Sequence, residues 1–411
     1  IRAVYSSSNG LEKRPKLRFP GFDEPWKETA LSSVLTERNE YAEKDGTYEH
    51  ATLSKEGIYG KTARYDRDFL VSTENKKYKV THLGDLCYNP ANLKFGVICL
   101  NTYGDAIFSP IYVTFEIEAS FDPDFIGAYL TRWDFINRAL KYQQGTVYER
   151  MAVSPEDFVS IKCCFPQKAE QTRLAEFITL LDNRIAAQGK YVESLKKYKR
   201  GVFEAVFSQK LRLVPTELQK PWKQYKLTDF ATRVTRKNGN QTDIPLTISA
   251  QYGLIDQRDF FSKMVASTDM SGYYLLQKGE FAYNRSTSNE YPFGSIKRLE
   301  LYPMGAVSTL YLCFAIKEEV VNSDLAKWYF ESSQWYKGIN NICAEGARNH
   351  GLLNVPTDGF FNTVHTLPSD PNEQLAVVDY LSNIQKKYEA AQRCLQAIEN
   401  LRSGLLQQLF I

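Results

Sequence analysis

One pattern of apolar residues occurs twice in this sequence, with 203 positions between the copies. In both copies the apolar residues recur at alternating steps of four and three, which is the heptad spacing of a helix with a narrow apolar stripe. Gln188 and Lys199 interrupt the stripe in the first copy, and Ala391 and Arg402 stand at the matching places in the second. Each copy therefore predicts one long amphipathic helix. The predicted seam consists of Leu174, Ile178, Leu181, Ile185, Val192 and Leu195, matched by Val377, Leu381, Ile384, Tyr388, Leu395 and Ile398.

The two copies also agree outside the stripe, because Glu170-Gln171 matches Glu373-Gln374 and Gly201 matches Gly404 without a gap. Two helices with the same stripe bury it most simply against each other, at about 25 cal/mol per Å² of apolar area removed from water. We therefore predict an antiparallel pair within the chain. The alternative is that each helix packs only on its neighbouring globular domain.

The length of 411 residues suits two domains of common size with connecting elements. We expect an N-terminal tail over 1–16, a first globular domain over 17–165 and a first long helix over 166–212. A second globular domain is expected over 213–367, and a second long helix over 368–411. The duplication continues into the globular parts, since Pro25-Trp26-Lys27 recurs as Pro221-Trp222-Lys223.

Each globular domain is predicted to be a mixed α/β domain, which makes the whole chain α+β with an internal pseudo-two-fold repeat. Gly57 and Gly253 follow serines at comparable places and predict turns with positive φ. β-branched and aromatic content between turn residues predicts strands over 86–88, 97–100, 111–117, 279–283 and 310–316. Short helices are predicted over 124–141 and 324–336, each with an Asp in the cap region.

The sequence carries no pattern of a self-sufficient enzyme. Gly60-Lys61-Thr62 ends like a phosphate-binding loop, but Lys55 stands where the first glycine is needed. Asn89-Pro90-Ala91-Asn92 lacks the second proline and the aromatic residue of base-amino methyltransferases. The seven cysteines form no CxxC pair and the four histidines are scattered, which argues against a zinc site. We find no signal peptide or membrane-length apolar run, so we expect an intracellular, cytoplasmic protein.

Basic residues in the globular segments are interleaved with amides, hydroxyls and tyrosines, which is the chemistry of phosphate neutralisation and base readout. The competing interpretations are solvated lysine runs, core tyrosines and, for 284–289, an ordinary surface loop. In the first domain the DNA-binding candidates are Lys55, Tyr59, Lys61, Arg64, Lys76, Lys77, Lys79, Asn89, Asn92, Lys94, Gln143, Gln144 and Thr146. In the second they are Arg233, Arg236, Lys237, Gln251, Tyr252, Asn284, Arg285, Ser286, Thr287, Ser288 and Asn289.

A further basic cluster lies near the end of the first helix, where Lys196, Lys197, Lys199 and Arg200 stand close together. We hypothesise that this end of the helix faces DNA or an acidic partner. A solvated helix end would explain the same residues.

Two unlike globular segments, each followed by a copy of one long helix, resemble the specificity subunit of type I restriction-modification systems. The helix openings at 166–171 and 368–374 carry Pro and Glu-Gln, and Arg18-Phe19-Pro20-Gly21-Phe22 fits the family's lead-in. The resemblance covers residues 17–411. It implies a non-catalytic protein with two target recognition domains, each reading one half of a bipartite, asymmetric DNA site. The helices would form an antiparallel coiled coil that sets the spacer.

The resemblance also implies partners and a cellular location. Two methyltransferase subunits would methylate adenine N6, and two motor-nuclease subunits would complete the complex in a bacterial or archaeal cytoplasm. This chain would bind no cofactor, and S-adenosylmethionine, ATP and Mg would lie on the partner subunits. The alternative function is a protein-binding scaffold whose duplicated domains are braced by the helices, and a second is a methyltransferase or nuclease that acts alone.

Overall fold

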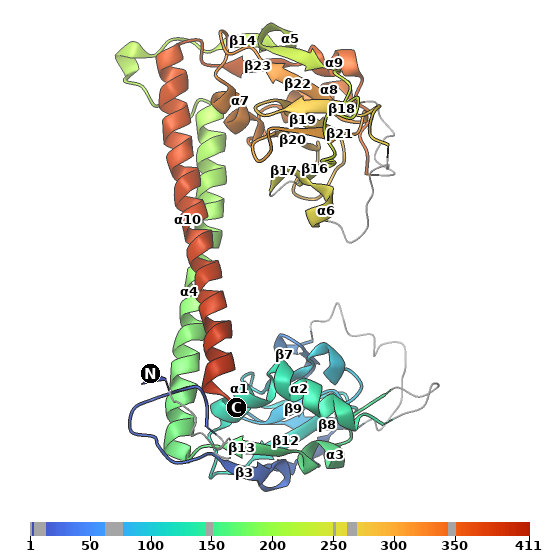
Figure 1. Cartoon of the computed structure of the whole chain (residues 1–411), viewed down its shortest axis with the longest axis vertical. Helices are drawn as coiled ribbons and strands as arrows, with labels where there is room; N and C mark the ends of the chain where they lie inside the picture. The colour runs from blue at the N-terminus through green and yellow to red at the C-terminus, as the bar shows by residue number, and fades with distance from the viewer. Residues whose placement is uncertain are drawn as a thin grey trace. The chain divides into compact units, whose positions relative to one another are not determined.

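The chain folds into two compact units, seen in a computed structural model that describes residues 2–3, 14–61, 77–144, 151–249, 252–260, 269–343 and 351–411 (Figure 1). Unit 1 contains residues 1–188 and 395–411, and unit 2 contains residues 189–394. Each unit therefore combines one globular domain with parts of both long helices. In the described part of the chain, no helix is both long and apolar enough to cross a membrane.

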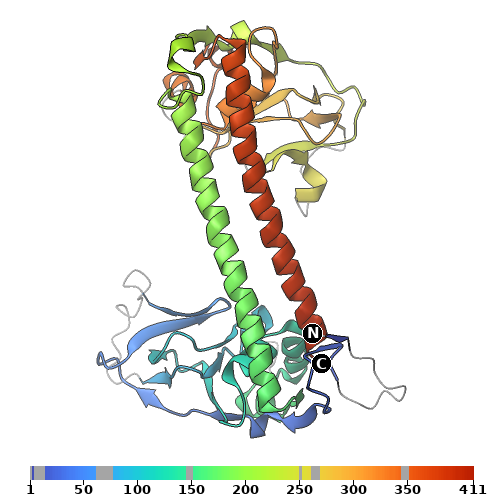
Figure 2. The same cartoon turned by 90° about the vertical axis from the view of Figure 1, so that its left-hand side faces the viewer.

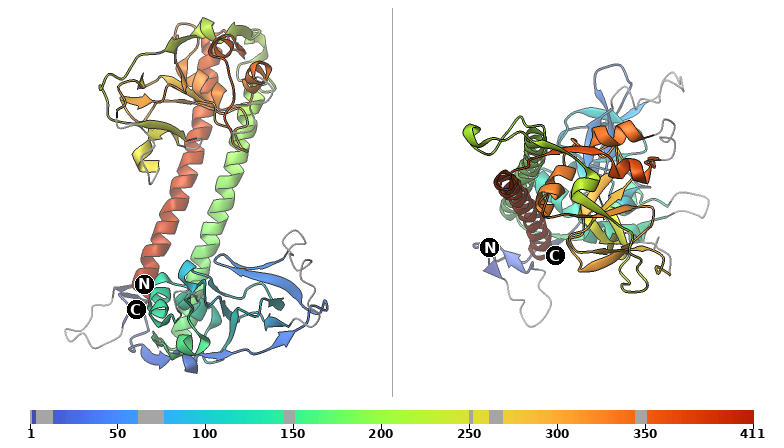
Figure 3. Two further views of the ribbon diagram at one scale, coloured as in Figure 1. Left: turned by 90° about the vertical axis from the view of Figure 1, so that its right-hand side faces the viewer. Right: turned by 90° about the horizontal axis from the view of Figure 1, so that it is seen from above.

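Two long helices, α4 (Lys168–Phe207) and α10 (Pro371–Leu409), confirm the two predicted heptad stretches. Within each unit they lie side by side and antiparallel (Figures 2 and 3). In unit 1, Arg402 of α10 contacts Asp182 of α4, and in unit 2 Lys199 contacts Gln385. No residue of the predicted seam is exposed. The predicted antiparallel pair is therefore confirmed. The alternative, in which each helix packs only on its neighbouring globular domain, is wrong.

The two basic residues that interrupt the stripe occupy equivalent places and make equivalent contacts. Lys199 donates from Nζ to Gln385 Oε1 at 2.8 Å, and Arg402 donates from Nη2 to Asp182 Oδ2 at 3.0 Å. Burial lowers the pKa of Lys199, whose ammonium lies 5.4 Å from the ring of Tyr388. Polar groups at seam positions favour the one register in which they find partners. These two contacts therefore reinforce the antiparallel register.

Unit 1 contains an antiparallel four-stranded sheet and a mixed five-stranded sheet. The four-stranded sheet has the order β10-β9-β12-β4 and the five-stranded sheet the order β5-β8-β11-β6-β7. Their strands are β4 (Leu35–Glu37), β5 (Tyr41–Ala42), β6 (Glu49–Ser54), β7 (Gly57–Gly60), β8 (Tyr78–Thr81), β9 (Leu86–Tyr88), β10 (Ile98–Leu100), β11 (Ala106–Phe108) and β12 (Val113–Ile117). Two-stranded pairs are formed by β1 (Arg2–Ala3) with β2 (Leu17–Arg18) and by β3 (Lys27–Ala30) with β13 (Lys162–Phe165). The helical elements are η1 (Leu31–Ser33), η3 (Leu93–Phe95), α1 (Pro123–Leu130), α2 (Trp133–Ala139), η4 (Leu140–Tyr142) and α3 (Pro155–Ser160).

Unit 2 repeats the four-stranded sheet as β15-β22-β19-β20 and contains three separate two-stranded pairs among its described residues. The strands are β14 (Lys223–Lys226), β15 (Ala231–Val234), β16 (Leu246–Ser249), β17 (Gly253–Asp256), β18 (Tyr274–Gln277), β19 (Phe281–Asn284), β20 (Ser295–Arg298), β21 (Met304–Val307), β22 (Leu312–Ile316) and β23 (Val364–Leu367). β14 pairs with β23, β16 with β17 and β18 with β21. The helical elements are η5 (Thr216–Leu218), α5 (Leu227–Phe230), α6 (Gln257–Phe260), α7 (Ser323–Phe330), α8 (Tyr336–Ile342) and α9 (Thr357–Phe361).

All five predicted strands are present, with corrected boundaries. The strands expected over 111–117 and 310–316 begin at Val113 and Leu312, two residues later than predicted. The residues before them form turns, in which the backbone amides of Tyr112 and Tyr311 donate to the carbonyls of Ser109 and Ser308. The positive φ predicted for Gly57 and Gly253 is confirmed at 129° and 80°.

The two predicted short helices are each divided, so the single helices expected over 124–141 and 324–336 were wrong. In unit 1 the division falls at Arg132, whose backbone is extended. The capping residues also differ from the prediction, since they are Asp122 and Asn322 rather than Asp124 and Asp324. An N-cap side chain must accept from an amide two or three residues ahead, and Asp122 does so from Phe125 at 3.1 Å.

The repeated Glu-Gln pair at the start of each long helix attaches it to a globular domain. In unit 1, the Arg18 guanidinium donates two hydrogen bonds of 2.7 Å to the Glu170 carboxylate, and both side chains are buried. Gln171 accepts from the Asp122 amide at 2.9 Å and donates to the Pro166 carbonyl at 2.9 Å. The Glu170 carboxylate and the Gln171 amide of this helix start are thus both hydrogen-bonded within the unit.

Unit 2 repeats the attachment with different chain segments. Arg212 donates to the Glu373 carboxylate at 2.6 and 2.9 Å, and Gln374 accepts from the Asn322 amide at 2.8 Å and donates to Pro368. The duplicated Glu-Gln therefore marks one structural device used twice.

The last aromatic residue of each helix segment packs on the other copy's domain. Phe410 follows α10 and lies against Trp26 and Tyr129 of unit 1, at ring-centroid distances of 6.5 and 5.6 Å. Phe207 ends α4 and lies 5.4 Å from Tyr329 in unit 2. Each globular domain thus rests on the start of one long helix and the end of the other.

A buried histidine distinguishes the two cores. His365 in β23 is 3% exposed, with Nδ1 3.1 Å from the Tyr329 hydroxyl and Nε2 2.8 Å from the Thr363 hydroxyl. Burial lowers the pKa of His365 to about 4. At the matching position of β13, unit 1 has Cys163, whose pKa burial raises to about 11. Only the unit 2 side chain of this pair titrates in mild acid.

We expect unit 2 to lose stability as the pH falls from about 6.5 to 4, by up to about 3 kcal/mol from His365 alone. The unfolded chain binds a proton at its ordinary pKa of about 6.5, whereas the folded chain binds it only near 4. The stability that unit 2 gains from neutral His365 is therefore complete above pH 6.5 and is lost as the pH falls below it. Urea unfolding of the full chain and of His365→Gln at pH 7 and pH 4.5 would measure it. An equal pH dependence in both proteins would contradict the assignment.

Candidate nucleic-acid interface

Equivalent loops follow the central strands β9 and β19, and an asparagine shapes each of them. Asn89 accepts from the amides of Ala91 and Asn92 at 3.1 and 3.2 Å, and Asn284 accepts from the Ser286 amide at 3.0 Å. Their side chains are buried or half-buried. Both predicted asparagines therefore build the loop, and the residues beyond them are the ones presented to solvent.

A second segment lies against each of these loops. In unit 1, the Val153 amide bonds to the Pro90 carbonyl, and Gln144 pairs with Ala152. In unit 2, the Leu353 amide bonds to the Arg285 carbonyl, and Ser286 pairs with Leu352. The structure thus brings together 89–94 with 143–144, two groups of candidates that lie far apart in sequence.

The unit 1 loop carries an exposed basic and aromatic surface. Lys94 is exposed, with its ammonium 5.1 Å from the ring of Phe95, which is 60% exposed. Trp133, 56% exposed, lies beside Gly96 at the end of the loop. Sequence reasoning missed Phe95 and Trp133, because it selected candidates among basic, amide, hydroxyl and tyrosine side chains. Exposed aromatic rings beside a cation can stack on bases or sugars.

The unit 2 loop is polar throughout, as the run 284–289 predicted. Ser286, Ser288 and Asn289 are exposed, while the Thr287 hydroxyl donates to the Gly351 carbonyl. Arg285 is half-buried and donates to the Leu310 carbonyl at 3.0 Å, so its guanidinium is partly committed to the domain. The exposed hydroxyl and amide groups can donate to and accept from base edges or phosphates.

Each unit also has a hairpin with an exposed tyrosine near its turn. Tyr59 of β7 is 50% exposed and donates from its hydroxyl to the Glu56 carbonyl at 3.0 Å. Tyr252, in the turn between β16 and β17, is 61% exposed. Lys55 is exposed in the first hairpin's turn, where Glu56 lies 3.5 Å away, and Lys61 follows β7.

The remaining described candidates differ in whether their side chains are exposed or already paired within the domain. Arg233 is exposed on β15, whereas Arg236 pairs with Glu280 at 2.7 Å and Lys237 donates to the Gly272 carbonyl at 2.9 Å. Lys77 is exposed before β8, and Asn92 and Gln143 are half-buried. Gln144 is exposed and donates to Asp157 at 2.9 Å. Arg64, Lys76, Thr146 and Gln251 lie outside the described residues.

Lys79 has a structural place instead of the predicted DNA-facing one. Its side chain is 2% exposed and donates to Glu37 at 3.2 Å and to Asn39 at 2.9 Å. Lys79 belongs to β8, an inner strand of the five-stranded sheet, and its ammonium is held by the end of β4 and by Asn39, so it is not free for phosphate.

The four basic residues near the end of α4 also differ in their surroundings. Lys199 faces α10, as described above, and Lys196 lies 3.7 Å from Glu290. Lys197 and Arg200 are exposed. The hypothesis that all four cations face DNA or an acidic partner is therefore corrected to Lys197 and Arg200, because Lys199 lies in the seam and Lys196 pairs with Glu290.

No group of three potential metal ligands occurs among the residues that the structure describes. Burial raises the pKa of the Cys99 and Cys313 thiols to about 12, which keeps them protonated and poorly nucleophilic at neutral pH. What both units present instead is loops and hairpins with cations, amides and exposed rings.

The fold is similar to that of three solved structures. The type I restriction-modification S subunit from M. genitalium matches with a TM-score of 0.55 and 14% identity, covering 97% of this chain and 99% of that one. The HsdS subunit from Thermoanaerobacter tengcongensis matches with 0.50 and 15%, covering 98% and 99%. A chain from a study of complex assembly and conformational transition of the type I R-M system matches with 0.55 and 15%, covering 96% and 97%. No protein-family model and no curated protein matches the sequence. At these identities the likeness establishes the fold.

Proposed function

We propose that this chain is the DNA specificity subunit of a type I restriction-modification complex. The observation that carries the proposal is the doubled attachment: each globular domain is fixed to the start of one long helix and the end of the other by equivalent residues. The fold, shared with S subunits over almost the whole chain, supports it. A repeated frame with two unlike surfaces is what reading two unlike half-sites requires.

In this proposal each globular domain reads one half of a bipartite DNA site. Exposed cations such as Lys94 and Arg233 would contact phosphates, while the amides and hydroxyls of 286–289 would read base edges. The helix pair is the spacer. At about 1.5 Å per residue, the 40 residues of α4 reach about 60 Å, longer than one turn of B-DNA at about 34 Å.

The proposed partners supply the reactions. Two methyltransferase subunits, carrying S-adenosylmethionine, and two motor-nuclease subunits, using ATP and Mg, would dock on this chain, which itself would take no part in bond making or breaking. The HsdS likeness and the match to a chain from the type I assembly study support such a complex.

The proposal is tested by mapping adenine methylation in cells that express this chain with its methyltransferase subunits. We expect one split, asymmetric motif to be modified, and none when this chain is omitted. Methylation that does not depend on the chain, together with DNA left unprotected by the purified complex, would favour a protein-binding scaffold. Binding of S-adenosylmethionine by the isolated chain would instead favour an enzyme acting alone.

Replacing Lys94 with alanine should weaken DNA binding by a similar factor on specific and non-specific DNA. If Lys94 neutralises one phosphate, the slope of log K against log salt should fall by about 1. Fluorescence anisotropy of the complex at several salt concentrations measures both quantities. Lys162→Ala, an exposed lysine on β13 away from the loops, is the matched control. Equal slopes for wild type and Lys94→Ala would remove Lys94 from the interface.

A further inference from the structure

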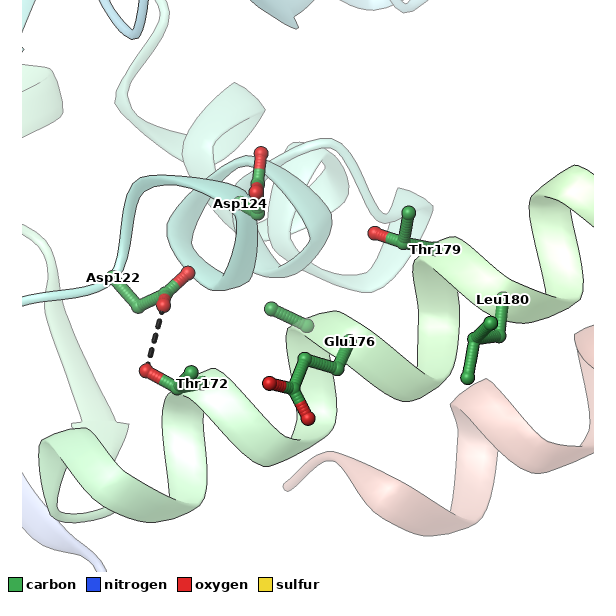
Figure 4. A pocket seen from close by; sticks show the side chains of 7 residues that line it. Asp122, Asp124, Thr172, Glu176, Thr179 and Leu180 are labelled. Atoms are coloured by element: carbon green, nitrogen blue, oxygen red, sulfur yellow. Dashed lines mark hydrogen bonds between the residues drawn. The ribbon is translucent and has the colours of Figure 1, made fainter.

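Unit 1 contains a cavity of about 400 Å³. It lies between α1 and α4, and Figure 4 shows its polar lining. The lining consists of Asp122, Asp124, Thr172, Ala175, Glu176, Thr179 and Leu180. All of these residues belong to unit 1, so the cavity is complete within one unit.

The matching place in unit 2 is filled by a tryptophan. Trp328 of α7 donates from its indole nitrogen to the Ser382 hydroxyl of α10 at 3.2 Å and is 6% exposed. Ser382 corresponds to Thr179, and Trp328 corresponds to Ala128, which follows Asp124 by one turn of α1. Unit 1 therefore has a small Ala128 side chain where unit 2 has an indole that contacts the equivalent of Thr179.

The matching aspartate in unit 2 is also neutralised, whereas that of unit 1 is not. Arg298 of β20 donates to Asp324 at 2.6 Å, and strand register places Leu100 of β10 at the equivalent position in unit 1. Within the described ranges, Asp124 makes no hydrogen bond or ion pair and is exposed. Glu176 has Arg173 3.2 Å away, and Asp122 is occupied by Thr172 and the Phe125 amide. Two side chains that fill and neutralise this place in unit 2 are thus both absent from unit 1.

We propose that this cavity is a docking site for one arginine side chain of a partner protein. A guanidinium is planar and carries several N–H donors, so it can pair with Asp124, whose carboxylate has no partner among the described residues, while its apolar stem covers Ala175 and Leu180. It would fill the space, as Trp328 does at the matching place in unit 2, and it would neutralise Asp124, as Arg298 neutralises Asp324. Because unit 2 carries Trp328 and the Arg298–Asp324 pair at the matching positions, we expect the contact once per chain. It requires neither DNA reading nor the spacer role of the helices.

The experiment titrates the full chain, carrying ¹³C-labelled Ala, Thr and Leu methyl groups, with N-acetyl-arginine methylamide. We expect saturable shifts at Ala175, Thr179 and Leu180, with the matching lysine compound binding about tenfold more weakly. Ala128→Trp should abolish these shifts by filling the cavity. Asp124→Asn should weaken binding about tenfold while the cavity stays open.

Trp328→Ala is the matched control, because it opens a similar space in unit 2 while Arg298 still pairs with Asp324. Arginine should not bind there. The proposal is overturned if arginine and lysine bind equally, if the tryptophan compound binds more tightly than arginine, or if the shifts persist in Ala128→Trp. Absence of saturable shifts in the wild-type chain would overturn it as well.

Discussion

Replacing Arg18 with methionine should lower the free energy of unfolding of unit 1 by about 3–5 kcal/mol. The Arg18 and Glu170 side chains are 4% and 1% exposed and share two hydrogen bonds. Removing the guanidinium leaves the Glu170 carboxylate buried at the start of α4 without its countercharge. Hydrogen exchange of the full chain under native conditions measures the loss, because amides of the two units are followed separately.

The double variant Arg18→Met with Glu170→Met separates pairing from packing. Replacing both partners by apolar groups of similar size is often nearly neutral, so much of the lost stability should return. The unit 2 counterpart Arg212→Met should cost less, because the Trp222 indole still donates to the Glu373 carboxylate at 3.1 Å. If the single and double variants are equally unstable, the ion pair is not the source of the loss.

The long helices could be predicted because their pattern is local. Heptad spacing is visible in any window of the sequence, and the repeat fixed the matching positions of Lys199 and Arg402. Their partners could not be predicted, since Gln385 and Asp182 lie 186 and 220 residues away. The same limit applies to the helix starts: the repeated Glu-Gln was visible, but the 152 residues between Arg18 and Glu170 hid the contact.

The candidate interface was predicted less well, because residue type does not determine exposure. Lys79 was counted with its basic neighbours, yet β8 is an inner strand and directs it to Glu37 and Asn39. Phe95 and Trp133 are exposed but were not among the candidates, which were chosen for polar chemistry. Asn89 and Asn284 were found for their chemistry, and the structure gives them a turn-forming role. Polar loops could be identified, but not the residues within them that reach solvent.

Exchange of residues 217–364 for the corresponding segment of another specificity subunit should change one half of the methylated motif and leave the other half intact. The exchanged segment carries the strands and loops of the second domain, while Arg212, Glu373 and Gln374 stay in place. The donor must therefore present a backbone amide where Asn322 now bonds to Gln374. Methylation mapping of the variant complex in cells gives the new motif directly.

The expected loss of binding to the original site is large. Mismatched base pairs cost about 1–3 kcal/mol each and add roughly, so a half-site with about three read positions would lose about 3–9 kcal/mol. The unchanged half provides the internal control, since the first domain and its Arg18–Glu170 contact are untouched. If both halves changed, the two domains would not read independently. If neither changed, residues 217–364 would not contain a reader, and the duplicated frame would have to serve protein binding instead.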